Sequence, residues 1–467
     1  MRQHTEPHTI CARATPPGNG AIAIVRVSGP QAIPLVDRLF LAHREGQNVL
    51  RAKSHSLIFG HIISPHTRQH IDDVLVAVMR GPHSYTGEDV VEINCHGSPA
   101  VVRTLLRVLT DHGARLAEPG EFTRRAFENG QIDLAQAEAV CDLIAAQTQS
   151  AAETALRRLG GQLSERLATV RGALIDLLAE IEAHIDFPEE DLPTVQIERW
   201  GMTLDGARDE IAQMEAGGAR GHLLAEGARV AIIGKPNAGK SALFNRLVGQ
   251  ERAIVTATPG TTRDSLESLA EAAGLPLLFV DTAGVREAAD EIERIGIERT
   301  QDQIHQANQI IVCIPADEPI SREDERVWSM AKGLDPLVVL TKCDLKAALT
   351  PPEVGERLGV KAILETSSVT GKGLEKLVQT IGRRLLAGVG SETNVDPLVA
   401  GERHLECLRS ARDSLAGAAE SLDSAAPRLE VIASDLRAGL APLDEILGLE
   451  IGDAVLDRIF ARFCIGK

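Results

Sequence analysis

The chain has 467 residues, about three times the roughly 150 residues of a typical domain, so we expect several domains. Hydrophobic residues make up 44% and charged residues 25%, which excludes a disordered chain, a collagen-like repeat and a disulfide scaffold. The net charge of -17 repels phosphate backbones, and 3% of aromatic residues is too few for a base-stacking single-strand binder, so any nucleic-acid contact must be local.

The cysteines and the hydropathy pattern predict a cytoplasmic protein. The seven cysteines are scattered, odd in number and form no C-x-x-C pair, which favours a reducing compartment over a disulfide or zinc framework. The first residues lack a secretory signal, and no segment approaches the roughly 18 apolar residues of a membrane span. We therefore expect no contact with a membrane.

The first 125 residues alternate short β-like runs with turns rich in Gly and Pro. The runs are AIAIVRVSG, DDVLVAVMRG and VVEINCHGS, and one helical stretch, PAVVRTLLRVLTDHG, accompanies them. This pattern predicts an α+β domain over 1–125.

From about residue 130 the pattern becomes helical. Apolar residues recur at steps of three and four, which predicts one face of a long helix ending near FPEEDLP. These residues are Leu156, Leu159, Leu163, Leu167, Val170, Leu174, Leu177 and Ile181. A second helix is expected around 197–215, followed by a Gly-rich joint, AGGARGH.

Helices return after about residue 390. Leucines at seven-residue spacing predict a bundle face, which Pro427 and Pro442 should interrupt, so we expect several packed helices. They are Leu408, Leu415, Leu422, Leu429, Leu436 and Leu443. A helical domain split by an inserted α/β module accounts for this order. Its first part is predicted at 126–219, the module at 220–385 and its second part at 386–467.

The module begins with a phosphate-binding motif. The segment RVAIIGKPNAGKS contains G-x-x-x-x-G-K-S directly after an apolar strand and before a helix. Backbone N–H groups of such a loop surround phosphates, Lys240 reaches the outer phosphates, and the Ser241 hydroxyl is expected to ligate Mg2+. We therefore predict a nucleotide site.

Switch elements follow in order. Thr262 of TTRD would complete the Mg2+ coordination when the γ-phosphate is bound. The strand LPLLFVDTAG would deliver Asp281 to hold the ion through water and the Gly284 N–H to the phosphate. Val285 stands where Ras-like GTPases carry the glutamine that orients water, so another group must do that work.

The segment TKCD selects the base. Asp344 can accept hydrogen bonds from the guanine N1–H and 2-amino groups, which adenine does not offer, so GTP is expected. Thr341 replaces the usual asparagine, and weaker contacts to the base edge are expected. The loop ETSSVTG resembles a base-capping loop in which Ser368 and Val369 replace Ala and Lys.

These residues and several others resemble the MnmE/TrmE family of tRNA-modification GTPases over essentially the whole chain. The further segments are ATPPGNGAIAIVRVSG, SYTGEDVVEINCHG, EPGEFTRRAF, NGQIDLAQAEA, IDFPEED and the terminal FCIGK. The terminal motif is the most specific, because P-loop GTPases are many and few of them end in helices followed by this sequence.

The resemblance implies a fold and a function. The fold is multidomain α/β plus α: an N-terminal α+β folate-binding domain that forms the homodimer, a split helical domain and an inserted Ras-like GTPase. The family, together with an FAD-dependent partner protein, modifies C5 of the wobble uridine of certain tRNAs. A reduced folate, 5,10-methylene- or 5-formyl-tetrahydrofolate, supplies one carbon, and glycine or ammonium the amine. K+ activates hydrolysis where two GTPase domains meet.

The resemblance also implies site residues. K+ would be bound by Asn237, Thr256, Thr258 and Thr261, and Glu293 would orient the attacking water. The full set expected at GTP is Asn237, Ala238, Gly239, Lys240, Ser241, Ala242, Thr256, Thr261, Thr262, Asp281, Thr282, Ala283, Gly284, Thr341, Lys342, Asp344, Ser367 and Ser368.

Folate would be contacted by Arg26, Glu92, Gln131 and Lys467. Gln131 stands where relatives commonly have lysine. Without the resemblance, Arg26 and Glu92 would be assigned to salt bridges at strand ends. Cys464 has three interpretations: a structural thiol, a catalytic thiol, or the cysteine of a prenylation box, for which Gly466 and Lys467 are unusual.

Two other functions remain open. A GTP-driven switch that assembles RNA or ribosomal complexes without covalent modification is equally compatible with the GTPase motifs. A structural scaffold with an inactive GTPase disagrees with the intact Lys240, Ser241, Thr262 and Asp281. For tRNA binding, Arg124 and Arg125 are candidates, and solvated helix residues or salt bridges explain them equally well.

Overall fold

The structure is a computed structural model, and it describes residues 8–64, 68–186, 194–249, 267–281, 304–388 and 396–467. The described chain divides into two compact units. The first contains 1–141, 159–164 and 444–467, and the second contains 142–158 and 165–443. Among the described residues, no helix is both long and apolar enough to cross a bilayer.

The first unit is built on a sheet whose described strands follow the order β3-β4-β5-β6-β2-β1-β7. All neighbouring strands are antiparallel except β1 and β7, which are parallel. The strands are β1 (Ile10–Arg13), β2 (Ile22–Ser28), β3 (Phe40–Ala42), β4 (Ser56–Ile63), β5 (His70–Met79), β6 (Val90–His96) and β7 (Arg115–Leu116). The three predicted runs are confirmed as β2, β5 and β6.

Two helices cover one face of this sheet. The predicted helix is confirmed as α2 (Pro99–Asp111), which starts with proline at its first turn, where a missing N–H is harmless. The expectation of one helix in this region was wrong, because α1 (Ala32–Leu39) also packs its apolar side on the sheet. Its eight residues are too few for periodicity to distinguish a helix from a strand.

Three further helices complete the first unit beside its C-terminal end. They are α3 (Glu121–Glu128), α4 (Leu134–Ala145), whose last turn lies in the second unit, and α15 (Asp453–Phe460). Leu134, Val140, Phe460 and Phe463 share an apolar cluster, so burial of these side chains fixes the chain end in this unit.

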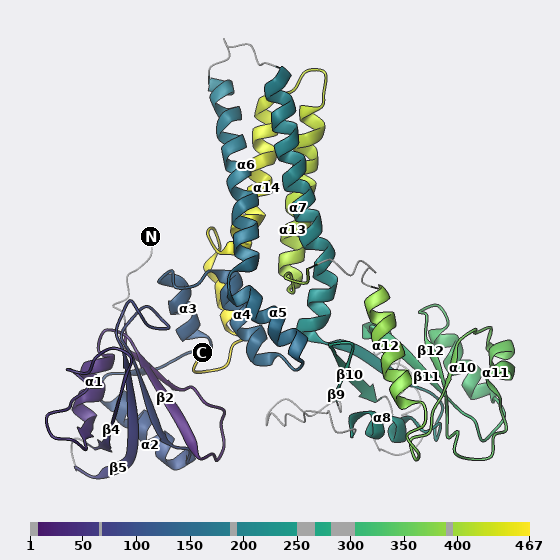
Figure 1. Ribbon diagram of the computed structural model, residues 1–467, viewed down its shortest axis with the longest axis horizontal. Coiled ribbons are helices and arrows are strands. Elements are labelled where there is room, and N and C mark those ends of the chain that lie inside the picture. Colours follow the sequence, from purple (N-terminus) through teal and green to yellow (C-terminus); the bar gives the residue numbers. More distant parts are fainter. Residues whose placement is uncertain (1–7, 65–67, 187–193, 250–266, 282–303, 389–395) are drawn as a thin grey trace. The chain divides into compact units, whose positions relative to one another are not determined.

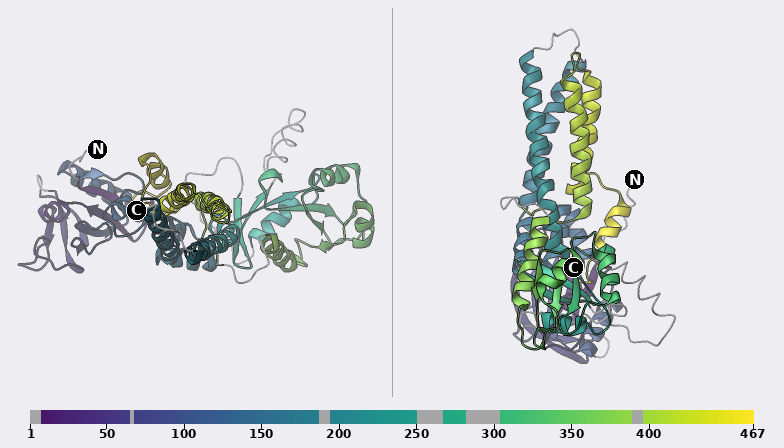
Figure 2. Two further views of the ribbon diagram at one scale, coloured as in Figure 1. Left: turned by 90° about the horizontal axis from the view of Figure 1, so that it is seen from above. Right: turned by 90° about the vertical axis from the view of Figure 1, so that its right-hand side faces the viewer.

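The second unit contains long helices from both sides of the module. They are α5 (Gln149–Leu159), α6 (Gln162–Asp186), α7 (Thr194–Glu226), α13 (Glu402–Leu422) and α14 (Leu429–Leu447). Figure 1 and both views of Figure 2 show α6, α7, α13 and α14 side by side as a bundle. Ion pairs join α6 to α7, between Arg166 and Glu210, and α7 to α13, between Glu215 and Arg409.

Three details of the helix prediction were wrong: the single long helix, the burial of Leu156, and the helix break at Pro442. The expected long helix is two, because Gly161 has φ +88 between α5 and α6, and Leu156 is 53% exposed. The end of α6 at Asp186 was predicted correctly. Pro427 lies between α13 and α14 as expected, but Pro442 lies inside α14. Its flanking Leu440 and Leu443 are buried, and their burial offsets the backbone hydrogen bond that proline removes.

The Gly-rich segment was also predicted wrongly as a joint, because it is part of helix α7. A Cβ on Gly218 would lie 2.1 Å from Leu405 Cδ2, and one on Gly221 would lie 2.0 Å from the Val399 carbonyl oxygen. The glycines are therefore required by close packing between α7 and the chain around α13 and do not mark a break.

The module has a mixed sheet with the order β13-β12-β11-β8-β10-β9 among its described strands. Only β9 is antiparallel to its neighbour. The strands are β8 (Ala228–Ile233), β9 (Glu267–Ala272), β10 (Leu275–Asp281), β11 (Gln309–Pro315), β12 (Leu337–Thr341) and β13 (Ile363–Glu365). The helices are α8 (Lys240–Val248), α10 (Arg322–Ala331), α11 (Pro351–Leu358) and α12 (Leu374–Gly388). Parallel strands place their carboxyl ends at one edge, where ligands of such sheets bind.

Candidate functional site: a nucleotide loop and a cluster at the chain end

The predicted phosphate loop connects β8 to α8. The strand β8 is buried in the middle of the sheet, and α8 begins at Lys240 with Gly239 as its N-cap residue. Asn237 and Gly239 have φ +62 and φ +84, so the loop turns back through left-handed conformations before the helix. The free N–H groups of the first helical turn then face the loop, which makes this helix terminus suited to anions.

Lys240 is the first residue of α8, and its side chain turns back onto this loop. Its side chain is buried, and its Nζ donates to the backbone carbonyl of Lys235 at 2.8 Å. This contact holds the ammonium inside the turn of the loop, where a phosphate oxygen would meet it. Ser241 follows in the first turn of α8 and is exposed, so its hydroxyl is accessible to a hydrated Mg2+.

Lys235 was not singled out from the sequence, although it fixes the same loop. Its Nζ lies 2.9 Å from Asp324 Oδ2 and 3.1 Å from Glu318 Oε1. Burial alone would lower the pKa of Lys235, but hydrogen bonds to Asp324 and Glu318 outweigh it and raise the pKa. Asp324 also closes the capping box of α10 with Ser321. The loop is therefore tied to the start of α10.

Thr341, at the end of β12, contacts the phosphate loop. Its hydroxyl lies 2.6 Å from the carbonyl oxygen of Ala238 and 3.3 Å from that of Ile314, and the side chain is buried. A hydroxyl has one hydrogen to donate, so the shorter contact to Ala238 is the main one. From the sequence, the replacement of the usual asparagine by Thr341 indicated only weaker contacts to the edge of the base. The structure adds a hydrogen bond between the base-recognition strand and the phosphate loop.

We expect Thr341→Val to weaken GTP binding about tenfold, because it leaves the buried Ala238 carbonyl without its donor at a cost of about 1–2 kcal/mol. Titration of a fluorescent GTP analogue measures the change. Thr366→Val is the matched control, since the buried Thr366 hydroxyl donates its hydrogen bond to the Leu340 carbonyl, at 3.1 Å, instead of to a carbonyl of the phosphate loop. Both variants should lose stability in urea, and equal GTP affinity in both would contradict the anchoring role of Thr341.

The base-recognition residues are held between two loops. The exposed Asp344 accepts a hydrogen bond through Oδ1 from the hydroxyl of the buried Ser367 at 2.6 Å. That hydroxyl oxygen in turn accepts from the backbone N–H of Thr370 at 3.1 Å. Lys342 has φ +57 and its Nζ lies 3.3 Å from Asp317 Oδ2. The hydrogen bond from Ser367 orients the Asp344 carboxylate before a base binds.

Several predicted site residues lie outside the described residues. They are Thr256, Thr258, Thr261, Thr262, Thr282, Ala283, Gly284, Val285 and Glu293. The backbone of Asp281 is described: it ends β10, in register with Ile232 of β8. This position places its Cα at the same sheet edge as the phosphate loop. Asn237 is an exposed residue of the loop itself, and its side chain offers an amide oxygen of the kind that suits a hard monovalent cation.

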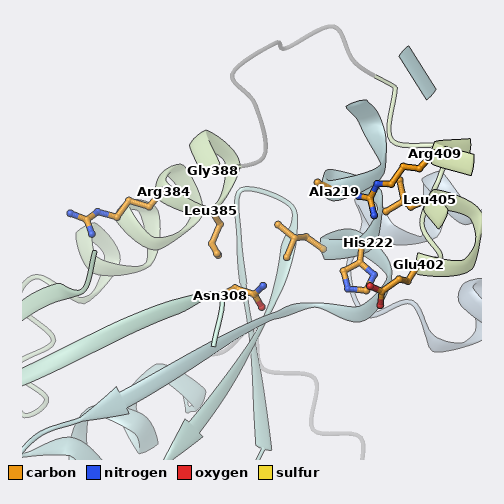
Figure 3. Close-up of a pocket in the computed structure, with 10 residues that line it drawn as sticks. Ala219, His222, Asn308, Arg384, Leu385, Gly388, Glu402, Leu405 and Arg409 are labelled. Atoms are coloured by element: carbon orange, nitrogen blue, oxygen red, sulfur yellow. The ribbon is translucent and has the colours of Figure 1, made fainter. Parts of the chain in front are cut away.

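A cavity in the second unit is separate from this loop. It has a volume of about 390 Å³ and is lined by residues of α7, α12 and α13 and by Asn308 (Figure 3). His222 and Glu402 lie at one side of it, and Leu385 and Arg384 belong to α12. None of its lining residues belongs to the predicted GTP site.

The first unit brings together three of the four predicted folate residues. Arg26 and Glu92 are direct partners on β2 and β6, and the Arg26 Nη2 to Glu92 Oε1 distance is 2.8 Å. Arg26 Nη1 also donates to the Gly466 carbonyl at 3.3 Å. The guanidinium carbon lies 5.3 Å from the Tyr85 ring centroid and 5.6 Å from that of Phe122. The salt bridge considered as the alternative is thus present, within a larger cluster.

The chain end is fixed at this cluster. Gly466 has φ +97, and a Cβ there would lie 2.2 Å from the Arg13 carbonyl oxygen, so a side chain would not fit. Burial, and then the positive charge of Arg26, lower the pKa of Lys467. Cys464 is an exposed free thiol. Gln131, the fourth predicted residue, is exposed after α3, with its side chain beside the turn at Gly87.

The donor set of this cluster fits a pteridine ligand. The Glu92 carboxylate can accept from an amino group and a ring N–H, and guanidinium and ammonium groups can meet carboxylates. The aromatic rings of Tyr85 and Phe122 were not predicted from the sequence. Their spacing gave no sign of a shared site, because Tyr85 lies in a turn and Phe122 lies in the first turn of α3, far apart in the chain.

The two arginines considered for tRNA contact are engaged in ion pairs. Arg124 lies 2.7 Å from Asp457 and 3.0 Å from Glu128. Arg125 lies 3.0 Å from both Glu88 and Glu121. These pairs confirm the salt-bridge alternative. The carboxylates also neutralise the positive charge that would otherwise attract a phosphate backbone.

Comparison with known proteins covers both parts of the chain. The family model described as MnmE helical domain matches residues 134–464, and the one described as GTP-binding protein TrmE N-terminus matches residues 9–131. A solved structure of Era from Aquifex aeolicus, bound to GDP and AlF4-, is 26% identical and covers 40% of this chain and 66% of its own, with a TM-score of 0.29.

Full-length relatives carry one name. The protein called tRNA modification GTPase MnmE in Geobacillus kaustophilus is 40% identical over 99% of this chain and 100% of its own length. The protein of the same name in Ligilactobacillus salivarius is 39% identical over 99% of both chains. Identity at this level over the whole length, with the nucleotide loop and the chain-end cluster in place, has one consequence: the chain belongs to the MnmE/TrmE family of tRNA-modification GTPases and is a GTP hydrolase of tRNA modification.

Proposed function

We propose that this chain is a K+-activated GTPase that, with an FAD-dependent partner protein, modifies C5 of the wobble uridine of certain tRNAs. A reduced folate would donate one carbon, giving a carboxymethylaminomethyl or aminomethyl group. The observation that carries the proposal is the chain end at Arg26 and Glu92, where Arg26 donates to the Gly466 carbonyl. A GTP-driven assembly switch needs no such second site in addition to its nucleotide loop.

In this proposal the phosphate loop binds GTP through its backbone N–H groups and Lys240, and Asp344 selects guanine. Ser241 and Thr262 would hold Mg2+, and Asp281 would hold it through water. The Gly284 N–H would contact the γ-phosphate. The described contacts of Lys235 and Thr341 support a loop that is preorganised for phosphate, so little ordering is needed on binding.

Hydrolysis needs a group that orients water, because Val285 occupies the usual glutamine position. We assign this role to Glu293, acting through a water molecule. Asn237, Thr256, Thr258 and Thr261 would hold K+, which supplies positive charge where negative charge develops at the phosphates. The exposed Asn237 in its left-handed conformation supports this assignment.

In the first unit, Glu92 would accept hydrogen bonds from the pteridine, while Arg26 and Lys467 would meet its carbonyl or glutamyl oxygens. Gln131 would contribute a neutral contact. Cys464, exposed three residues before the terminus, would act next to the folate as a catalytic thiol.

Partners and compartment belong to the same proposal. An apolar outer sheet face supports a homodimer through the N-terminal domains, because Phe59 and Leu75 are cross-strand partners and are 45% and 44% exposed. We infer that a separate FAD-dependent protein and tRNA bind in the cytoplasm. We also retain the predicted domains at 1–125, 126–219, 220–385 and 386–467 as part of the proposal.

The test is GTP turnover by the purified chain in KCl and in NaCl at equal ionic strength, with ATP as the control. We expect KCl to accelerate GTP hydrolysis at least about fivefold, since K+ and Na+ differ in the oxygen cage they prefer. Equal rates in the two salts would contradict the K+ site. Analysis of tRNA nucleosides after incubation with the FAD-dependent partner and folate then separates the proposals: intact GTP turnover without modified uridine would favour the assembly switch.

A further inference from the structure

A cluster of three metal-ligating side chains lies on the β4–β5 hairpin of the first unit, outside both sites described above. His61 Nδ1 lies 2.6 Å and His70 Nε2 lies 2.7 Å from Asp73 Oδ1, and the two nitrogens are 3.3 Å apart. We propose that His61, His70 and Asp73 form a binding site for a divalent transition metal ion of the Zn2+ class.

The strand register explains how the chain assembles this cluster. His61 of β4 and Asp73 of β5 are direct cross-strand partners, and they are on the outer face of the sheet. His70 would lie on the opposite face of a regular strand, because side chains alternate. The register shifts between Ile62 and Ile63, whose partners are Asp72 and His70, so β5 has one extra residue there. This bulge turns His70 to the same face as Asp73.

The donor atoms suit a tetrahedral ion. Zn2+ binds imidazole nitrogens at about 2.0–2.1 Å, so two nitrogens of one tetrahedral site lie about 3.3–3.4 Å apart. The observed 3.3 Å between His61 Nδ1 and His70 Nε2 meets this requirement without movement of either ring. Two imidazoles and a carboxylate are a donor set for Zn2+ and discriminate against Mg2+ and Ca2+, which prefer oxygen ligands.

The carboxylate must move slightly when the ion binds. Its oxygen is 2.6 and 2.7 Å from the nitrogens, and a shared ion would lengthen both distances to about 3.3 Å. The Asp73 side chain is 50% exposed, so it can rotate outward or present its other oxygen. In the single chain the His70 side chain is 54% exposed, so water has access there to complete the coordination. The ring of His43 lies 6.2 Å from that of His61 between centroids, in an edge-on arrangement.

The competing explanation is a hydrogen-bonded triad with no affinity for metal, in which both imidazoles donate to one carboxylate oxygen. It predicts the same distances in the absence of ions. The two explanations differ in one respect: an ion takes the place of the hydrogen on each of the two nitrogens, each ring proton moving to the other nitrogen of its imidazole, and its binding requires all three side chains.

The experiment is titration of untagged, nucleotide-free protein with Co2+ and Zn2+. We expect one Co2+ ion per chain with the visible absorption of a tetrahedral site, displaced by Zn2+. His70→Ala and His61→Ala should each lower Zn2+ affinity at least about tenfold, and Asp73→Asn several-fold, because each removes one ligand. His83→Ala is the matched control, since His83 is an exposed histidine of the same unit outside the cluster, and it should bind as the original chain does.

Three results would overturn the proposal. They are the absence of a tetrahedral Co2+ spectrum, Zn2+ affinity that is unchanged in His70→Ala, and a thiolate-to-cobalt charge-transfer band, which would place the ion on a cysteine such as Cys464. Far-ultraviolet circular dichroism of each variant shows that it is folded. If the single variants bind weakly for structural reasons, His70→Gln tests the ligand with a similar volume. Loss of binding in that variant supports the site, and retention overturns it.

Discussion

Asp344→Asn is expected to reverse the base preference of this chain from guanine to xanthine. The Asp344 carboxylate would accept two hydrogen bonds from guanine, at N1–H and at the 2-amino group. Xanthine carries a carbonyl oxygen in place of that amino group, and an asparagine amide can donate to it. We expect GTP affinity to fall about a hundredfold, since the amide N–H would face the 2-amino group at a cost of about 3 kcal/mol.

The structure indicates that this substitution changes the contacts to the base without changing the contact to Ser367. Ser367 donates to Asp344 Oδ1 at 2.6 Å, and the asparagine carbonyl can accept the same hydrogen bond. The loop should therefore keep its conformation, and XTP affinity should rise while GTP affinity falls. Competition between the two nucleotides for a fluorescent GTP analogue measures both changes.

Glu365→Gln is the control for loss of a negative charge near the base. Glu365 is exposed, ends β13 directly before the same loop, and has a weak contact to Lys372 at 3.9 Å. It should leave the preference for GTP intact. If Asp344→Asn also keeps that preference, Asp344 does not select the base.

Arg26→Gln is expected to abolish binding of reduced folate while leaving the first unit folded. The change removes the charge that would meet folate oxygens and leaves Glu92 without its partner, so we expect affinity to fall at least about a hundredfold. The loss of the half-buried ion pair should also lower the free energy of unfolding by about 1–2 kcal/mol. Isothermal titration with 5-formyl-tetrahydrofolate and urea denaturation measure the two effects.

Arg125→Gln separates folate binding from stability. The Arg125 and Glu88 side chains are 12% and 20% exposed, against 13% and 23% for Arg26 and Glu92, so the two ion pairs are equally buried in the same unit. Both substitutions should therefore cost similar stability. Only Arg26→Gln should lose folate binding, and equal folate affinity in the two variants would remove Arg26 from the site.

The sequence alone determined the features that depend on neighbouring residues. The apolar run before Gly234 and the spacing of Lys240 and Ser241 specify the strand, loop and helix that bind phosphate. Periodicity predicted α2 and the end of α6. Such signals are short-range, because backbone conformation, capping and amphipathic faces are encoded within a few turns of chain. The motifs at both ends of the chain likewise indicate the family, because each is a contiguous run of residues.

Only the tertiary structure decided which distant residues meet. Lys235 and Asp324 are 89 residues apart, and Thr341 and Ala238 are 103 apart, so no spacing rule could pair them. The same holds for Gly221, whose role in α7 depends on the Val399 carbonyl against it, and for the bulge that turns His70 toward Asp73. In each case the deciding contact is made by a partner that folding brings from elsewhere in the chain, and packing against that partner overrides the local preference of the segment.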